Sequence, residues 1–205
     1  MKIALDSHYA ILASGVGSNA LALLQTGKSL LHPAGLVIAT NSNSPLEQYC
    51  KDHSVNFKYL RAANDKVDFE DCLLAELKKH RIDWIFLAGF MKILSAHFLK
   101  EFSIFAKGKI FNIHPSLLPL YPGLKGYEKS FRNKDEFYGH SIHLVEETVD
   151  AGEIVSQVKI KADHQIDLEK YIELGKKVEN ENYASVLKKL LLGRLNERCK
   201  VEIYE

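Results

Sequence analysis

Two polar side chains, Asn112 and His114, lie two residues apart at the end of the apolar run 109–113. Side chains alternate between the two faces of a β-strand, so both should project to the same side of a sheet. A carboxamide can donate a hydrogen bond to a carbonyl oxygen that becomes an oxyanion, and an imidazole can donate a second bond or move protons. A single histidine at a strand end is more often structural, but this pair, followed by Pro115, favours a site for acyl-type transfer.

The sequence shows no pattern of a covalent nucleophile or of a metal site. It contains neither GxSxG nor a comparable cysteine motif, which disfavours a covalent hydrolase. Its three cysteines, Cys50, Cys72 and Cys199, are odd in number and have no CxxC or Cys/His ligand spacing, which argues against a disulfide framework and a zinc site. We therefore expect metal-independent chemistry.

A glycine-rich stretch at 13–20, ASGVGSNA, ends one apolar run and opens a segment that can be helical. Gly15 and Gly17 would let the backbone approach a ligand closely, while the amides at the start of the helix face an anion. Phosphate binding and a plain strand-to-helix connection capped by Ser18 or Asn19 explain this feature equally well.

The same stretch matches the dinucleotide fingerprint G-x-G-x-x-A, which would indicate an oxidoreductase. That fold needs an acidic residue at the end of the second strand to hold the adenosine ribose, or basic residues for a 2′-phosphate. Here the apolar run 36–40 continues into the uncharged stretch 41–44, NSNS. We therefore favour a simple phosphate monoester as the ligand.

Apolar runs suited to buried strands alternate with segments of helical periodicity along the chain. The runs lie at 9–13, 35–40, 56–60, 83–88, 109–113, 141–145 and 154–160. A helical segment can follow each of the first four, and the clearest helices are 67–80, a segment capped by Ser95, and 167–192. The alternation predicts an α/β fold: a single domain over 1–205 with one doubly wound, mostly parallel sheet. Ligands should bind beyond the carboxyl ends of its strands.

The composition indicates a protein that binds small molecules. With 205 residues, 46% of them hydrophobic, the chain can bury one substantial core. Its 27 basic and 26 acidic residues nearly balance, so no nucleic-acid or membrane surface is indicated. No apolar run is long enough to span a bilayer, and residues 1–7 are too few and too polar for a secretory signal, so we expect a cytoplasmic protein.

Five segments together resemble one enzyme family. They are 14–19 (SGVGSN), 87–94 (LAGFMKIL), 111–119 (FNIHPSLLP), 121–123 (YPG) and 149–154 (VDAGEI). In this order they closely resemble the glycinamide ribonucleotide formyltransferases, and the likeness runs over residues 9–195. The pattern Asn-x-His-Pro-Ser with a downstream Asp is highly specific for the folate-dependent formyltransferase superfamily, which has a Rossmann-like fold.

The resemblance implies transfer of a formyl group from 10-formyltetrahydrofolate, as co-substrate, to the primary amine of glycinamide ribonucleotide in de novo purine biosynthesis. Asn112, His114 and Asp150 occupy the positions of the family's catalytic trio. The amine would attack the formyl carbon while Asn112 and a protonated His114 stabilise the oxyanion, and the charge of Asp150 would favour the protonated ring. A water near Asp150 could carry the proton from the amine to the leaving nitrogen. Without the resemblance, Asp150 would simply belong to a turn.

The resemblance also assigns residues that would bind the acceptor. The substrate phosphate would be held by Gly17, Ser18 and Asn19, and by Lys176, which stands where a neutral amide is common in relatives. The substrate ribose would be held by Glu179, although a charged helix residue usually belongs to a solvated face.

For the reduced folate, the resemblance assigns the loop that lines the pterin pocket. Its residues are Met91, Lys92, Ile93 and Leu94. Plain core packing explains the apolar members equally well. Ser141 and His143, on the strand before Asp150, resemble positions that help to order the aspartate, and they also suit ordinary strand positions.

Two alternatives remain open. Relatives carry histidine-containing sequence just after the proline-glycine turn, whereas this chain has Lys125 and Tyr127 there. The first alternative is therefore a folate-dependent formyltransferase that acts on another amine, such as an amino sugar attached to a nucleotide. The second is a folate-binding protein without catalysis, which the retained polar trio argues against. The partners implied are a phosphorylated amine and a reduced folate, with neither nucleic acid nor membrane, and a homodimer stays open.

Overall fold

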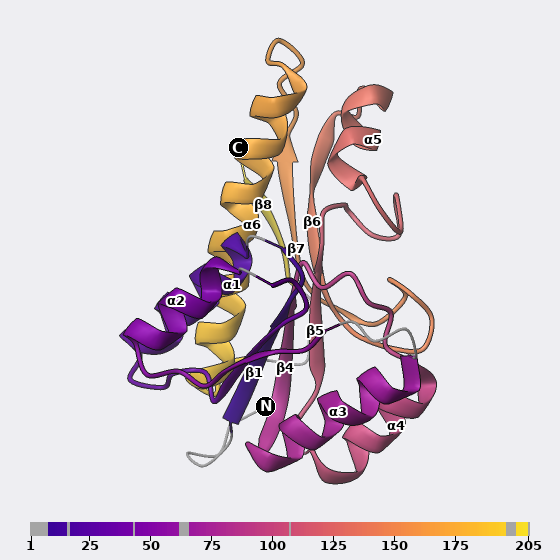
Figure 1. The fold of residues 1–205 in the computed structure, drawn as a ribbon. Helices are drawn as coiled ribbons and strands as arrows, with labels where there is room; N and C mark the ends of the chain where they lie inside the picture. Colours follow the sequence, from indigo (N-terminus) through magenta and orange to yellow (C-terminus); the bar gives the residue numbers. More distant parts are fainter. Residues whose placement is uncertain are drawn as a thin grey trace.

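The computed structural model describes residues 8–15, 17–42, 44–61, 66–106, 108–195 and 200–204. Their strands are β1 (His8–Ala13), β2 (Leu36–Ala39), β3 (Phe57–Tyr59), β4 (Ile82–Ala88), β5 (Ile110–His114), β6 (Phe137–Leu144), β7 (Ile154–Lys161) and β8 (Lys200–Tyr204). The helices are α1 (Ser18–Ser29), α2 (Pro45–Asp52), α3 (Lys66–Lys79), α4 (Ala96–Phe105), α5 (Gly126–Asn133) and α6 (Leu168–Leu191). The strands form one sheet in the order β3-β2-β1-β4-β5-β6-β7-β8, with helices on both of its faces (Figure 1). The predicted doubly wound α/β fold is confirmed.

Parallel pairing dominates the sheet. β1 is parallel to β2 and β4, β2 to β3, β4 to β5, and β7 to β8, whereas β6 is antiparallel to both β5 and β7. The strands β1, β4 and β5 therefore end at one edge, where ligands bind in folds of this kind. At this edge the backbone N–H of Ser14, just after β1, donates to the carbonyl of Gly89, just after β4, at 3.2 Å. This bond joins the glycine-rich turn to the predicted folate loop.

Alternation along the central strands divides the core into two layers. Tyr9 and Ile11 of β1 pack with α1 and α6, while Ala10 and Leu12 pack with α3 and α4. All four side chains are completely buried, as expected for a strand that helices cover on both faces. This double covering explains why the strands appear in the sequence as continuous apolar runs. Within the described ranges, no helix is both long and apolar enough to cross a membrane.

The predicted strands and the helices expected at 67–80, after Ser95 and at 167–192 are all present. The structure differs from the expectation at β6, which begins at Phe137 instead of 141 because His140 is buried in the strand. Asn182 of α6 donates from Nδ2 to Nε2 of His140 at 3.0 Å, while its Oδ1 accepts from Ser156 at 3.1 Å. A distant helix thus pairs with Nε2 of this buried ring, whereas its Nδ1 is buried without a hydrogen-bond partner in the described residues.

Burial of His140 predicts a loss of stability in acid. Burial lowers the pKa of its imidazole from 6.5 to about 3. The unfolded chain therefore takes up a proton below pH 6.5 that the folded chain does not bind until about pH 3. The stability linked to His140 is complete above pH 6.5 and falls by about 1.4 kcal/mol per pH unit as the pH drops through this interval. Denaturant unfolding of wild type and His140→Gln should show this additional slope in the wild type only, and parallel pH profiles would contradict the assignment.

Candidate active site

β5 and β6 place their polar side chains opposite one another. In the antiparallel register Asn112 pairs with His143, and His114 pairs with Ser141. Nδ2 of Asn112 lies 3.1 Å from Nε2 of His143. The His143 ring donates from Nδ1 to the carbonyl of Leu144 at 2.8 Å, so Nε2 of the neutral ring accepts from Asn112. Burial lowers the pKa of His143, which favours this neutral acceptor form.

Asp150 reaches the same place from the loop between β6 and β7. Its backbone is left-handed, with φ of 56°, and its side chain is only 7% exposed. Oδ2 accepts from the backbone N–H of Gly123 at 2.8 Å and lies 3.4 Å from Nδ1 of His114. Oδ1 lies 3.6 Å from Nε2 of His143. The structure thus brings Asn112, His114 and Asp150 together in one cluster that also contains His143.

This cluster has the donors and the charge that acyl transfer requires. Asn112 uses one Nδ2 hydrogen toward His143 and keeps a second for a ligand oxygen. His114, when protonated, carries a hydrogen on Nδ1 beside the carboxylate of Asp150. Such donors stabilise the oxyanion of a tetrahedral intermediate. Among the residues whose placement is described, no group of three or more His, Cys, Asp or Glu side chains could hold a metal ion.

Ser141 lies against the loop that follows β5 and not against the aspartate. Its hydroxyl donates to the carbonyl of Ser116 at 2.7 Å and accepts from the backbone N–H of Leu118 at 3.0 Å. Nε2 of Gln157 donates to the same hydroxyl at 2.9 Å. These bonds show Ser141 fixing this loop, and its role in ordering Asp150 stays a prediction. The pairing of β6 with β7 shifts register between Ile142 and His143. Ser141 lies before this shift and the last residues of the strand lie after it, so their surroundings differ.

The start of α1 is open to an anion. Its N-cap is Gly17, which has φ of 81° and offers no side chain, so no side chain caps the helix amides. A Cβ at Gly17 would lie 3.0 Å from Leu46, so glycine suits both the backbone and the space. Ser18 is exposed, and Oδ1 of Asn19 is buried without a hydrogen-bond partner in the described part of the chain. The uncapped amides could hold an anion, whereas Oδ1 of Asn19 would need a hydrogen-bond donor as its partner.

Glu179 is buried beside this helix start and does not belong to a solvated face. It is 6% exposed, and its carboxyl oxygens accept from Nδ2 of Asn19 at 3.4 Å and from the hydroxyl of Tyr127 at 3.2 Å. Burial raises the pKa of Glu179 to about 7, although both hydrogen bonds and the charge of Lys176 act to lower it. Lys176 is exposed on the preceding turn of α6. The residues predicted for the phosphate and the ribose therefore gather at one end of the sheet.

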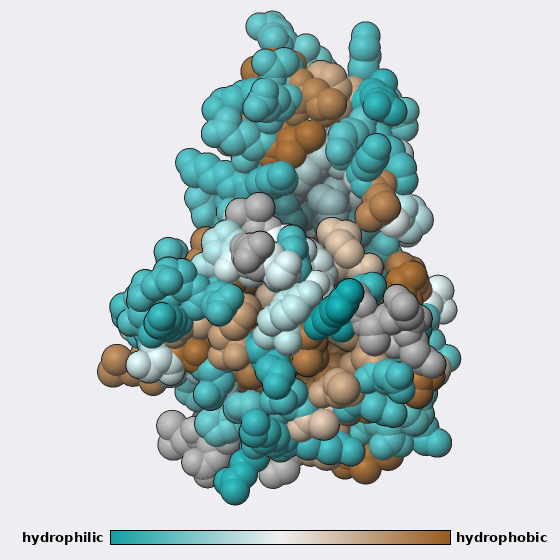
Figure 2. Space-filling view, in the orientation of Figure 1, coloured by the Kyte–Doolittle hydropathy of each residue, from teal (hydrophilic) through white to brown (hydrophobic). Residues whose placement is uncertain are grey.

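Tyr127 is a site residue that the sequence patterns do not assign. It belongs to a small aromatic cluster with Tyr138 and Tyr171, and hydrophobic surface is visible between α5 and the beginning of α6 (Figure 2). A Cβ at Gly175 would lie 2.8 Å from the Tyr127 ring. Gly175, which by propensity weakens α6, thus makes room for the tyrosine that donates to Glu179. Two features of the sequence point to it: its place just after the proline-glycine turn, where this chain departs from its relatives, and a glycine one turn before a charged helix residue.

The residues of the predicted folate loop, 91–94, lie partly on the surface and partly in the core. Met91 and Ile93 are 67% and 62% exposed, and Lys92 is exposed as well. Leu94 is only 6% exposed and packs in the core layer of α3 and α4, so the plainer interpretation holds for this side chain. Exposed apolar side chains next to a polar cluster suit a flat aromatic ligand better than they suit water.

Comparisons with known proteins agree with this arrangement. The profile of the family described as "Formyl transferase" matches residues 7–187. Phosphoribosylglycinamide formyltransferase of Bacillus subtilis is 33% identical over 187 residues, which cover 89% of this chain and 94% of that protein. The enzyme of the same name from Haemophilus influenzae is 32% identical and covers 91% of this chain and 88% of its own. The crystal structure of phosphoribosylglycinamide formyltransferase from Bacillus halodurans is 32% identical, has a TM-score of 0.82, and covers 90% of this chain and 95% of that one. The chain therefore belongs to the formyl transferase family and, within it, to the phosphoribosylglycinamide formyltransferases.

Proposed function

We propose that this protein transfers the formyl group of 10-formyltetrahydrofolate to the primary amine of glycinamide ribonucleotide. The observation that carries the proposal is the meeting of Asn112, His114 and Asp150 in one cluster, at the sheet edge that also holds the open start of α1. Clustered donors favour acyl transfer, and an uncapped helix start favours a phosphorylated acceptor. The relatives' names supply the remaining step, which is the identity of the amine.

The reaction begins when the amine nitrogen attacks the formyl carbon. Negative charge develops on the formyl oxygen, and the free Nδ2 hydrogen of Asn112 and the protonated ring of His114 donate to it. The carboxylate of Asp150, with Oδ2 3.4 Å from Nδ1 of His114, attracts the positive charge of that ring. As the bond from carbon to the folate nitrogen breaks, a water beside Asp150 carries a proton from the attacking amine to that leaving nitrogen.

The acceptor lies along the start of α1. The amides of the first turn, with Gly17, Ser18 and Asn19, bind the phosphate, and the charge of Lys176 adds to the attraction. Glu179 binds the ribose hydroxyl groups, because each of its oxygens keeps a lone pair beyond the bonds from Asn19 and Tyr127. With a pKa of about 7, its carboxyl group can donate as well as accept at neutral pH.

Ser14 links the glycine-rich turn to the folate loop. We therefore expect its substitution to affect folate binding selectively. Its hydroxyl oxygen accepts from the backbone N–H of Met91 at 3.0 Å and from the hydroxyl of Thr40 at 2.7 Å. Ser14→Ala removes the side-chain acceptor that holds the Met91 N–H, so we expect KM for the folate to rise roughly three- to tenfold and KM for the amine to change by less than about twofold. Steady-state kinetics with each substrate varied in turn measure both. Thr40→Val, which removes only the other bond to Ser14, is the control and should affect the folate less; equal rises in both KM values would contradict the link.

Turnover with two acceptors tests the proposed function. We expect release of tetrahydrofolate, followed by absorbance, when the purified protein is given 10-formyltetrahydrofolate and glycinamide ribonucleotide. An amino sugar attached to a nucleotide is assayed in parallel, because Lys125 and Tyr127 replace the histidine-containing sequence of relatives. Turnover with the amino sugar alone would overturn the proposal in favour of that acceptor. Folate binding without turnover of either amine would mark a binding protein.

A further inference from the structure

The ring of His114 is held from both sides. Its Nε2 lies 2.9 Å from the backbone carbonyl oxygen of Tyr121, and its Nδ1 lies 3.4 Å from Oδ2 of Asp150. A carbonyl oxygen can only accept, so Nε2 carries a hydrogen in the neutral ring as well as in the protonated ring. The hydrogen that the ring gains or loses is then the one on Nδ1.

We propose that Tyr121 is a positioning residue that fixes His114 as the Nε2–H tautomer and thereby assigns Nδ1 to the reacting formyl group. This inference rests on the proposed formyl transfer. The bond to Tyr121 occupies the Nε2 hydrogen, which is therefore not free for an oxyanion. The distance of 3.4 Å between Nδ1 and Asp150 exceeds that of a strong charge-assisted hydrogen bond, so the Nδ1 hydrogen can be shared between this carboxylate and the developing oxyanion.

The two acceptors around His114 compete for the hydrogen of the neutral ring. A carboxylate at Nδ1 favours the Nδ1–H tautomer, whereas a carbonyl at Nε2 favours the Nε2–H tautomer. Tyr121 makes the closer contact, 2.9 Å against 3.4 Å for Asp150. The contact with Tyr121 has the length of a hydrogen bond and the contact with Asp150 is longer than the usual range, so the position of the Tyr121 carbonyl decides the tautomer.

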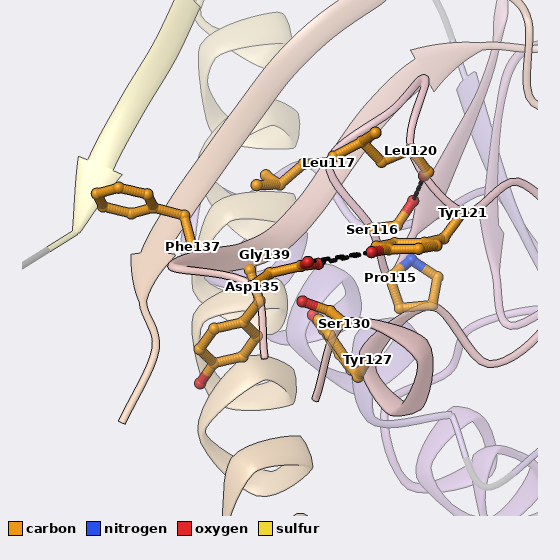
Figure 3. A pocket seen from close by; sticks show the side chains of 11 residues that line it. Pro115, Ser116, Leu117, Leu120, Tyr121, Tyr127, Ser130, Asp135, Phe137 and Gly139 are labelled. Atoms are coloured by element: carbon orange, nitrogen blue, oxygen red, sulfur yellow. Dashed lines mark hydrogen bonds between the residues drawn. The ribbon is translucent and has the colours of Figure 1, made fainter. Parts of the chain in front are cut away.

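The phenol of Tyr121 anchors a backbone conformation that non-glycine residues rarely adopt. Its φ is 53°, in the left-handed region. The phenol donates to the carboxylate of Asp135, with 2.9 Å to Oδ2 and 3.1 Å to Oδ1, and accepts from Nδ2 of Asn133 at 2.7 Å. Figure 3 shows Tyr121 and Asp135 pointing toward one another across the loop. Asn133 is the last residue of α5, so this helix holds the carbonyl in place through the side chain of Tyr121.

The segment before Tyr121 is fixed as well. The hydroxyl of Ser116 donates to the carbonyl of Leu120 at 2.6 Å (Figure 3), and the N–H of Leu120 donates to the carbonyl of Leu117 at 3.0 Å. Ser141 holds the carbonyl of Ser116 from the other side at 2.7 Å. The cavity behind this loop measures only about 10 Å³, room for about one water molecule. The loop therefore has little space to shift into this cavity.

Tyr121→Phe tests this role, because it removes the anchoring hydroxyl and keeps the ring. We expect kcat to fall about tenfold with each KM within about twofold of wild type, as for the loss of one buried orienting bond. Nitrogen-15 NMR of histidine-labelled protein reads the tautomer directly, and His114→Gln identifies the His114 signals. The neutral wild-type ring should show a hydrogen-bearing Nε2 and a bare Nδ1, whereas Tyr121→Phe should give the averaged signals of two tautomers.

Further variants distinguish the loss of the anchoring hydrogen bond of Tyr121 from a general effect on folding. Asp135→Ala should reproduce both changes, and Asp135→Asn, which keeps an acceptor for the phenol, should restore most of kcat and the tautomer. Tyr49→Phe, the same substitution on α2, is the matched control and should alter neither.

An Nδ1–H tautomer in the wild type would overturn the proposal, and so would an unchanged tautomer or an unchanged kcat in Tyr121→Phe. The NMR result does not depend on turnover. A wild type with the Nε2–H tautomer that forms no product from glycinamide ribonucleotide would therefore sink the proposed function while it supports the role of Tyr121.

Discussion

Asp150→Asn should lower kcat at least about 100-fold and leave the dissociation constant of the reduced folate within about threefold of wild type. Asparagine keeps the shape of the side chain and tolerates the φ of 56° at this position. Its amide oxygen can still accept from the N–H of Gly123, so the loop keeps its structure. The variant loses the negative charge whose oxygen lies 3.4 Å from Nδ1 of His114. Steady-state kinetics and an equilibrium titration with folate measure the two quantities.

Two further variants show whether this charge acts through His114. Asp52→Asn makes the same chemical change at the exposed end of α2 and should leave kcat unaltered. The double variant with His114→Asn and Asp150→Asn should be little slower than His114→Asn alone, because both changes remove the same contact between the carboxylate and the ring. Losses that multiply would show that Asp150 acts independently of His114. A parallel loss of folate binding and turnover in Asp150→Asn would assign the residue a structural role.

The strands of this protein can be predicted from the sequence because of how the sheet is covered. Helices bury both faces of the central strands, so each strand is a short continuous apolar run. Local signals also place helix starts: the hydroxyl of Ser95 accepts from the N–H of Phe98 at 3.1 Å, as its position before an apolar periodic segment indicates. Helix α5 gives no comparable signal. It has eight residues, and its packing depends on Gly175 in a helix far along the chain.

Only those residues of the candidate site that are close together in the sequence can be placed from local geometry. Strand alternation alone puts Asn112 and His114 together, and the family pattern is needed to add Asp150 from another loop. In the sequence Glu179 looks like a solvated helix residue. Its burial cannot be read from α6 alone, because it depends on Asn19 and Tyr127, which come from two other helices.

Backbone groups are the part of the site that residue types do not reveal. The carbonyl of Tyr121 and the N–H groups of Gly123 and Met91 bind His114, Asp150 and Ser14, and any residue type possesses such groups. They reach their partners only through positive φ values or close loop contacts, such as the φ of 53° at Tyr121. The sequence therefore predicts the side chains of the candidate site but not the backbone groups that orient them.

Asn112→Ala should lower kcat roughly 100- to 1000-fold with little change in the equilibrium binding of either substrate. The reason is that a donor to the formyl oxygen contributes mainly once that oxygen becomes negative, so its loss affects the transition state more than the ground state. Single-turnover kinetics with saturating folate measure the chemical step directly. A loss of less than about tenfold would mean that other groups stabilise the oxyanion, and the role assigned to this cluster would then be wrong.

We expect His143 to orient the carboxamide of Asn112. Nε2 of the neutral ring accepts one Nδ2 hydrogen at 3.1 Å, and this bond leaves the other hydrogen directed at the ligand. His143→Phe keeps the buried volume and removes the acceptor, so we expect kcat to fall about tenfold in an otherwise wild-type protein. In the Asn112→Ala background the same substitution should cost almost nothing, because there is no carboxamide left to orient. Equal effects of His143→Phe in both backgrounds would place His143 in direct contact with the reaction instead of behind Asn112.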